Sequence, residues 1–185
     1  MTILARDRAP LSPATSTAQV SGGNILSLLG AMQAFRRTGE QILAEHGIVG
    51  VQADAWYPLD AYVAALDAIT TRIGPKTIFR VGQEIPNHIP LPPGLDSFEK
   101  IAGSFGPAFA MNHRGAGLGG ISHTITGPRS ARIVSGTPYP CEFDRGVIQG
   151  FFSSLLKVRC VIEADEKAPC KSRGGRNCTY DVRLP

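Results

Sequence analysis

The feature that most constrains the fold is a change of hydrophobic period partway along the chain. As far as Gly115 the apolar residues recur at helical spacing, whereas from Gly119 onward short β-prone segments are separated by turns. Helices are thus gathered toward the front and hairpins toward the back, without the strand–helix alternation of a parallel-sheet protein. The pattern predicts an α+β domain whose helices pack on an antiparallel sheet that includes a C-terminal β-hairpin.

The individual elements follow from local period and from turn residues. The expected helices span residues 24–46 (with a break near Gly39), 59–73, 96–115 and 142–156. The expected strands span residues 48–53, 119–126, 130–135, 158–165 and 178–184. Residues 76–85 fit a helix or a strand equally well, and the prolines between residues 86 and 94 exclude regular structure there.

Length and composition indicate one globular domain behind a short leader. The chain has 185 residues, of which 43% are hydrophobic, which is enough for one core. Residues 1–22 are rich in Pro, Ser, Thr and Ala and lack an apolar period, so we expect a flexible leader there. The domain is then expected over residues 23–185, with a helical N-terminal part over residues 23–74.

Charge and hydropathy argue against membrane and nucleic-acid partners. No stretch approaches the roughly 18 consecutive apolar residues of a membrane span, and the opening residues lack the order of a signal peptide. The net charge of +4 is dispersed and is not interleaved with aromatic residues. We therefore expect a soluble cytoplasmic protein that binds neither membranes nor nucleic acid.

Three of the four cysteines stand where the chain turns. Cys141 precedes a helix, and Cys170 and Cys178 bracket a Gly-containing loop between two strands. In a cytoplasmic protein these thiols stay reduced, which favours metal or thiol chemistry over a disulfide. Such a loop is flexible enough to bring both sulfurs to one zinc ion, at about 2.3 Å from each. With Glu166 as fourth ligand, or Asp165 or Glu163 in its place, the site would be closed and structural.

Other interpretations of the cysteines stay open at this point. Free cysteines are often small buried hydrophobes, and Cys160, on a strand face between Val158 and Ile162, is expected to be a core residue. Cys141 would serve a cysteine-dependent enzyme if a base lay beside it, but the local sequence supplies none.

The C-terminal third resembles the closing hairpin of 4-vinyl reductase domains. The shared pattern is an acidic strand, Cys170, a Gly-containing turn, Cys178 and an aromatic residue, Tyr180, two positions later. Pro140-Cys141 followed by Gly146 and Gly150 is similar to the family's earlier cysteine and its glycine-bearing helix. The resemblance covers roughly residues 75–184, with specific motifs only from residue 138 onward.

The resemblance implies a sensory or regulatory domain for a small molecule, as in the phenol-sensing modules of bacterial regulators, with zinc held by three cysteines and one glutamate. Cys141, Cys170 and Cys178 match the cysteines, and Glu166 is the nearest match to the acid. The family's acid usually stands three residues before the second cysteine, a position that Lys167 occupies in this chain.

The related heme-nitric oxide/oxygen-binding family supplies the alternative of a gas sensor with heme. Its Tyr-x-Ser-x-Arg motif corresponds to Tyr139-Pro140-Cys141-Glu142-Phe143 here, so Phe143 stands in place of the arginine expected to hold the heme propionates. His88, His113 and His123 are the candidate axial ligands.

We expect the small, largely apolar ligand to bind between the helices and the sheet. The candidate binding residues are Trp56, Tyr57, Phe79, Phe105, Phe109, His113 and Phe152. Ligand binding would shift the packing of the closing hairpin, and a second copy of the chain or a signalling partner would respond. An accessory biosynthetic role is the remaining alternative.

Overall fold

A computed structural model describes residues 17–185, so the greater part of the expected leader, residues 1–16, lies outside the described residues. The helices are α1 (Gly22–Ala31), α2 (Arg36–Glu45), α3 (Leu59–Ile73), α4 (Pro75–Glu84), α5 (Phe98–Asn112) and α6 (Cys141–Leu156), and 3-10 turns lie at Gln33–Phe35, Ile85–Asn87 and Lys171–Arg173. The strands are β1 (Gln19–Ser21), β2 (Trp56–Pro58), β3 (His113–Arg114), β4 (Ile121–Gly127), β5 (Ser130–Ser135), β6 (Val161–Ala164) and β7 (Cys178–Arg183).

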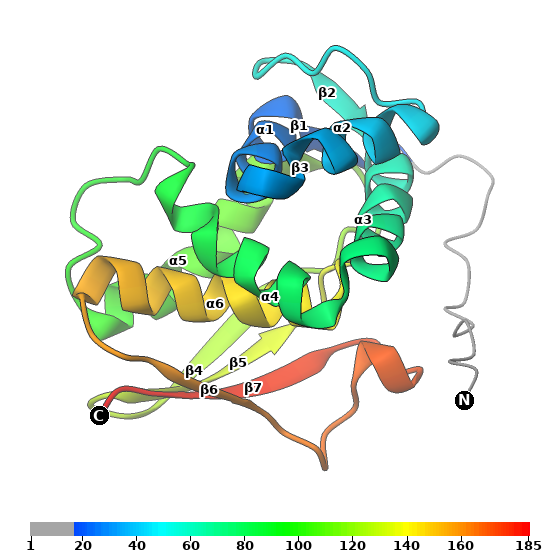
Figure 1. The fold of residues 1–185 in the computed structure, drawn as a ribbon. Coiled ribbons are helices and arrows are strands. Elements are labelled where there is room, and N and C mark those ends of the chain that lie inside the picture. Colours follow the sequence, from blue (N-terminus) through cyan, green and yellow to red (C-terminus); the bar gives the residue numbers. More distant parts are fainter. Residues whose placement is uncertain (1–16) are drawn as a thin grey trace.

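The larger sheet has the strand order β4-β5-β7-β6, and all its pairs are antiparallel. It lies below the helices in Figure 1, with α6 running above it. Strands β4 and β5 form the expected hairpin, and β7 returns between β5 and β6, so that Ser135 pairs with Cys178. The predicted α+β class, with helices on an antiparallel sheet and a C-terminal hairpin, is confirmed.

The smaller sheet was not predicted, and it corrects the boundary of the leader. Strand β1 lies between β2 and β3, and its central residue, Val20, is fully buried. Residues 19–22 therefore belong to the domain, and Ser21 caps α1 by accepting a hydrogen bond from the Asn24 amide. A strand of three residues is too short to show a period in the sequence. The strand expected over 48–53 is wrong: that stretch is a loop, and β2 follows it at Trp56–Pro58. A short β-prone stretch does not form a strand unless a partner strand lies beside it.

The helices agree with the sequence pattern except at their breaks. The helix expected over 24–46 is interrupted at Gln33, which has a left-handed φ of 45°, and not at Gly39. Gly39 stays helical and packs on Met32, whose sulfur would lie 2.5 Å from an added Cβ. The ambiguous segment 76–85 is helix α4, with Pro75 at its first turn. None of the described helices is long and apolar enough to span a membrane.

Helix α6 is held close to α4 by glycines, which explains their spacing in the sequence. An added Cβ at Gly146 would lie 2.1 Å from the carbonyl oxygen of Phe79, and one at Gly150 would lie 2.3 Å from that of Gln83. Only a residue without a side chain permits this approach. The two glycines therefore determine how closely α6, which begins at Cys141, packs against α4.

Candidate metal centre

Three cysteine sulfurs form a triangle between the start of α6 and the closing hairpin. The Sγ atoms of Cys141 and Cys178 lie 3.3 Å apart, those of Cys170 and Cys178 3.3 Å apart, and those of Cys141 and Cys170 3.8 Å apart. Two sulfurs bound tetrahedrally to one zinc ion at 2.3 Å lie about 3.8 Å from each other. Only the Cys141–Cys170 distance has this length, and the other two are about 0.5 Å shorter, so the three sulfurs form a compact group that is close enough to share one metal ion.

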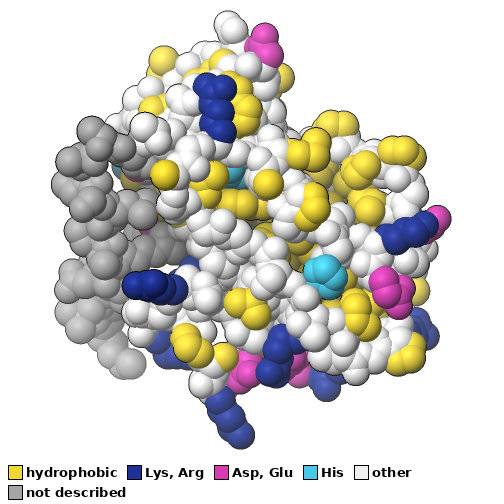
Figure 2. All heavy atoms as spheres, turned by 180° about the vertical axis from the view of Figure 1, so that it is seen from behind, with side chains coloured by type: hydrophobic (Ala, Val, Ile, Leu, Met, Phe, Trp, Pro, Cys, Tyr) yellow, Lys and Arg dark blue, Asp and Glu magenta, His cyan; other side chains and the backbone are white. Residues whose placement is uncertain are grey.

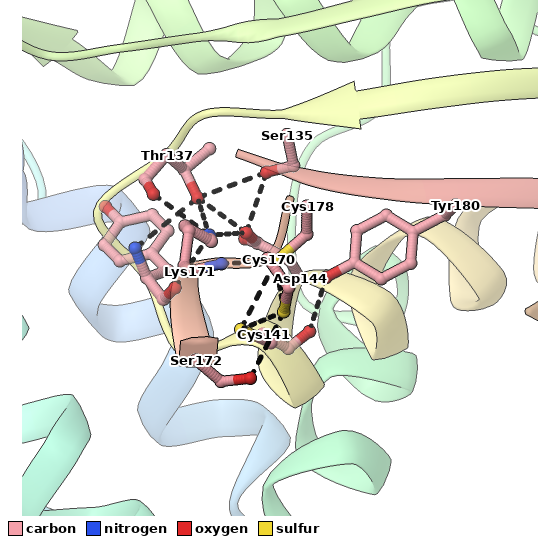
Figure 3. A network of polar contacts seen from close by, with 10 residues as sticks. Ser135, Thr137, Cys141, Asp144, Cys170, Lys171, Ser172, Cys178 and Tyr180 are labelled. Carbon is pink, nitrogen blue, oxygen red and sulfur yellow. Dashed lines mark hydrogen bonds and ion pairs between the residues drawn. The ribbon is translucent and has the colours of Figure 1, made fainter. Parts of the chain in front are cut away.

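Each cysteine is positioned by a different element, as Figure 3 shows. Cys141 begins α6, Cys170 precedes the 3-10 turn, and Cys178 begins β7. The hydroxyl of Tyr180 donates a hydrogen bond of 2.9 Å to the Cys141 carbonyl, so β7 also holds the first residue of α6. The site joins two segments that are 29 residues apart at Cys141 and Cys170.

The surroundings of the sulfurs favour negative charge on one of them. The Cys178 thiol donates to the Cys141 sulfur, and this hydrogen bond, with the nearby Lys171 ammonium, lowers the pKa of Cys141 to about 5. The pKa of Cys178 is raised because its proton is shared with Cys141. The Lys171 amide also donates to the Cys178 sulfur at 3.4 Å. A thiolate here is the form that binds metal.

Cys160 does not join the triangle. It is 2% exposed, and its sulfur contacts the carbonyl oxygen of Val161. Burial raises the pKa of its thiol to about 12. The prediction that Cys160 is a core residue is confirmed.

A buried ion pair, which no sequence pattern predicts, lies beside the sulfurs. The Lys171 ammonium donates to Asp144 Oδ2 at 2.6 Å, and the two side chains are only 7% and 6% exposed. The same oxygen accepts from the hydroxyls of Ser135 at 2.8 Å and Thr137 at 2.6 Å. Lys171 also donates to the carbonyls of Thr137 and Tyr139 (Figure 3). Every charge in this network is paired, as burial requires.

The expected fourth ligand is not brought to the triangle. Glu166 is exposed, and among the described residues the three cysteines are the only group of three or more whose metal-binding atoms all lie within 4.8 Å of one another. Asp165 accepts from the amides of Lys167 and Ala168, and Glu163 pairs with Arg183 at 2.6 Å. The two other candidate acids are thus engaged elsewhere.

Four of the predicted ligand-binding residues have buried rings on α5, β3 and α6, here called the aromatic cluster, and their ring contacts fall into two groups. Phe105 and Phe152 have ring centroids 5.8 Å apart, and Phe109 stacks on His113 at 3.9 Å. Tyr139 was not predicted to bind ligand, but its ring lies beside Phe109 and His113, with its centroid 5.6 Å from that of His113. The cluster has an apolar interior with one polar pair, His113 and Tyr139.

The other three predicted ligand-binding residues have separate partners. Trp56 lies on β2 beneath the guanidinium of Arg114, which is 4.3 Å from the ring centroid. The Tyr57 hydroxyl accepts from the Gln52 amide at 2.9 Å. Phe79 on α4 contacts the Arg145 guanidinium at 4.6 Å.

A surface hollow of about 320 Å³ lies apart from all seven predicted residues, between α1, α2 and the loop that follows α2. Its lining is mostly apolar and consists of Leu26, Leu29, Arg36, Glu40, Leu43, Ala44, Ile48, Val49, Gly50 and Val51.

Figure 2 shows the molecule from behind, where basic side chains are spread out and those near the lower edge are mixed with acidic ones.

The residues present do not fit a heme site built on the candidate histidines. The His113 Nδ1–H donates to the Phe109 carbonyl at 2.6 Å, and Nε2 accepts from the Tyr139 hydroxyl, so neither ring nitrogen is free for iron. His88 and His123 are exposed. Phe143, in place of the propionate-binding arginine, is buried against the Tyr139 ring.

His113 is expected to make stability depend on pH. Burial lowers its pKa below the ordinary value of 6.5. An unfolded chain then binds a proton below about pH 6.5 that the folded chain does not, so stability falls as the pH drops from 6.5 toward the folded-state pKa, by up to about 1.4 kcal/mol per pH unit. In urea titrations at several pH values, His113→Phe should have a shallower slope in this range than the wild type. Equal slopes for His113→Phe and the wild type would contradict the assignment.

No family model and no curated protein sequence matches the chain. Several solved H-NOX structures match its fold. A mutant H-NOX from T. tengcongensis is 12% identical with a TM-score of 0.64, and the match covers 89% of this chain and 97% of that one. A mutant H-NOX protein from S. oneidensis in the Fe(II) state is 14% identical with a TM-score of 0.62, covering 88% and 95%.

The oxygen complex of an oxygen-binding H-NOX domain related to soluble guanylate cyclases is 11% identical with a TM-score of 0.62, covering 89% of this chain and 94% of that domain. Identities this low establish the fold and not the ligand. The chain therefore has an H-NOX-like α+β fold, with three clustered cysteines beside its closing hairpin.

Proposed function

We propose that this chain is a small-molecule-binding sensory domain of the 4-vinyl reductase type, whose closing hairpin is fixed by a structural zinc ion. The observation that carries the proposal is the triangle of Cys141, Cys170 and Cys178 sulfurs, 3.3–3.8 Å apart. A zinc ion bound there would cross-link α6 to the loop between β6 and β7. The pairing of Lys171 with Asp144 and the Tyr180 hydrogen bond bring the same segments together.

The sensing part of the proposal depends on α6. This helix carries Cys141 at its start and Phe151 and Phe152 near its end, and the Phe151 ring contacts that of Phe105 on α5. A small apolar ligand that enters the aromatic cluster would shift α6 and, through Cys141, the hairpin. The ligand acts by favouring one of two packings, which a second copy or a partner protein then binds.

Metal analysis tests the zinc site. We expect about one zinc per chain by elemental mass spectrometry of tag-free wild-type protein, because three thiolates with this spacing favour zinc. Cys170→Ala should lose the zinc, whereas Cys160→Ala, which removes the one cysteine outside the triangle, should keep it. A folded wild-type protein without zinc, or equal zinc in both variants, would refute the site.

Small aromatic probes test the ligand site. We expect toluene or phenol to raise the Tm of the wild type saturably, because each would bind among the rings of the aromatic cluster and stabilise the folded state. Phe109→Trp, which adds volume at the cluster, should reduce the response, whereas Ile125→Trp, on the exposed face of β4, should leave it intact. The cluster is not the binding site if both variants respond equally or the wild type shows no saturable shift.

A further inference from the structure

We propose that the metal held by the three cysteines keeps its fourth position open to ligands from solvent. A small-molecule thiol would bind there as thiolate, displacing a water molecule and releasing its proton to the solvent. The inference rests on the proposed zinc site and adds to it a ligand class and an exchangeable position. It differs from the sequence-based expectation, in which a protein carboxylate closes the site.

The geometry leaves the fourth position without a protein carboxylate or imidazole. In a tetrahedral site, an oxygen ligand at 2.0 Å from zinc would lie about 3.5 Å from each sulfur. Among residues 17–185, however, no His, Asp or Glu atom lies within 4.8 Å of all three sulfurs. The Ser172 hydroxyl oxygen lies 3.2 Å from the Cys170 sulfur. A hydroxyl is not among the usual zinc ligands, which are thiolate, imidazole and carboxylate.

The acids closest in sequence to the cysteines are held by other groups. On α6, Glu142 pairs with Arg145 at 2.6 Å, and Asp144 is occupied by Lys171. In the loop after β6, Asp165 accepts two backbone amides and pairs with Arg132 at 3.3 Å.

The loop that carries Glu166 is itself held in place. The Arg173 guanidinium donates to the carbonyls of Glu166 and Ala168, at 3.1 and 2.8 Å. Moving Glu166 to the metal would have to break these two hydrogen bonds. The Glu166 side chain is left in solvent.

A thiolate suits the open position in softness, and basic residues around the site offset the negative charge that it adds. Four sulfurs are a common zinc ligand set, so one external thiolate completes a favoured set. Zinc with three thiolates has a net charge of −1, and a fourth thiolate makes it −2. Lys171 is neutralised by Asp144, but Lys167, Arg173 and Arg176 are exposed on the loop around the cysteines and attract an anionic thiol. Cys141 and Cys170 are both partly exposed, which gives the thiol a path to the metal.

The test uses the full chain loaded with Co²⁺ in place of zinc, kept reduced by a phosphine so that added thiol does not act as a reductant. Titration with 2-mercaptoethanol or glutathione should change the visible absorption of the cobalt saturably, and native mass spectrometry should show one thiol per metal-loaded chain. Competition with a chromophoric chelator should show zinc affinity rising about elevenfold when the thiol is at ten times its dissociation constant.

Two variants separate the possible fourth ligands. Glu166→Gln and Ser172→Ala should each leave the cobalt spectrum and its response to thiol unchanged. A changed starting spectrum in either variant means that the protein closes the site, and the proposal is then wrong. Arg176→Gln should lower the affinity for glutathione by a larger factor than the affinity for 2-mercaptoethanol, which carries no other charged group. An equal loss of affinity for both thiols would contradict the role of loop charge.

The outcomes also distinguish this inference from the proposed function. If the wild type binds no stoichiometric Co²⁺ or zinc, the zinc site itself fails. If it binds one metal ion whose spectrum and affinity do not respond to thiols, the zinc site stands and the open thiol-binding position is refuted.

Discussion

Removing zinc from the loaded chain should lower its free energy of unfolding by about 4 kcal/mol, if the starting free zinc is about a thousand times the dissociation constant. The three ligands come from α6, the loop after β6 and β7, so an unfolded chain does not present them together. The measurement is urea unfolding with and without a chelator. Loss of the metal should loosen the closing hairpin first, which hydrogen exchange at β6 and β7 detects.

Cysteine variants provide the matched controls for zinc removal. Cys160→Ala should lose as much stability on chelation as the wild type does, because its sulfur lies outside the triangle. Cys178→Ala removes the sulfur that lies 3.3 Å from both of the others, so chelation should hardly change its stability. A chelator effect of equal size in Cys178→Ala would place the metal elsewhere.

Replacing Lys171 by Met should destabilise the chain by about 3–5 kcal/mol, because it leaves the buried Asp144 carboxylate without a cation. The substitution keeps the apolar length of the side chain and keeps the backbone amide that donates to Cys178. Urea unfolding of apo protein measures the effect apart from metal. The exposed Lys167→Met should change stability by no more than about 0.5 kcal/mol.

A double variant identifies the cause of that loss. In Lys171→Met with Asp144→Asn, the buried charge is gone, yet the amide still accepts from Ser135 and Thr137. About 2 kcal/mol of the lost stability should return. If the double variant is no more stable than Lys171→Met alone, the loss comes from packing and not from an unpaired charge.

Local sequence pattern was enough for most elements of the fold. Helix α3 follows its apolar period from Leu59 to Ile73, where Gly74 ends it, and the hairpin of β4 and β5 follows two β-prone segments around a turn. Strand β1 and the break at Gln33 escaped prediction because each involves about three residues, fewer than one period. The conformation of β1 is set by neighbours distant in the chain, because Val20 pairs with Tyr57 on one side and with His113 on the other.

The candidate site, like the fold, was predictable from the sequence only in part. That Cys141, Cys170 and Cys178 could meet was readable from the sequence, because each stands at a turn and a short loop links two of them. The sequence by itself thus determined the fold class and which three cysteines lie together. Only the tertiary structure decided that Lys171 pairs with Asp144, 27 residues away, and that Glu166 stays in solvent. It also decided that the Tyr139 hydroxyl occupies the Nε2 atom of His113. The reason is that side-chain partners across a fold depend on how α6 packs on the sheet, and hydrophobic period reports only which face of each element is buried.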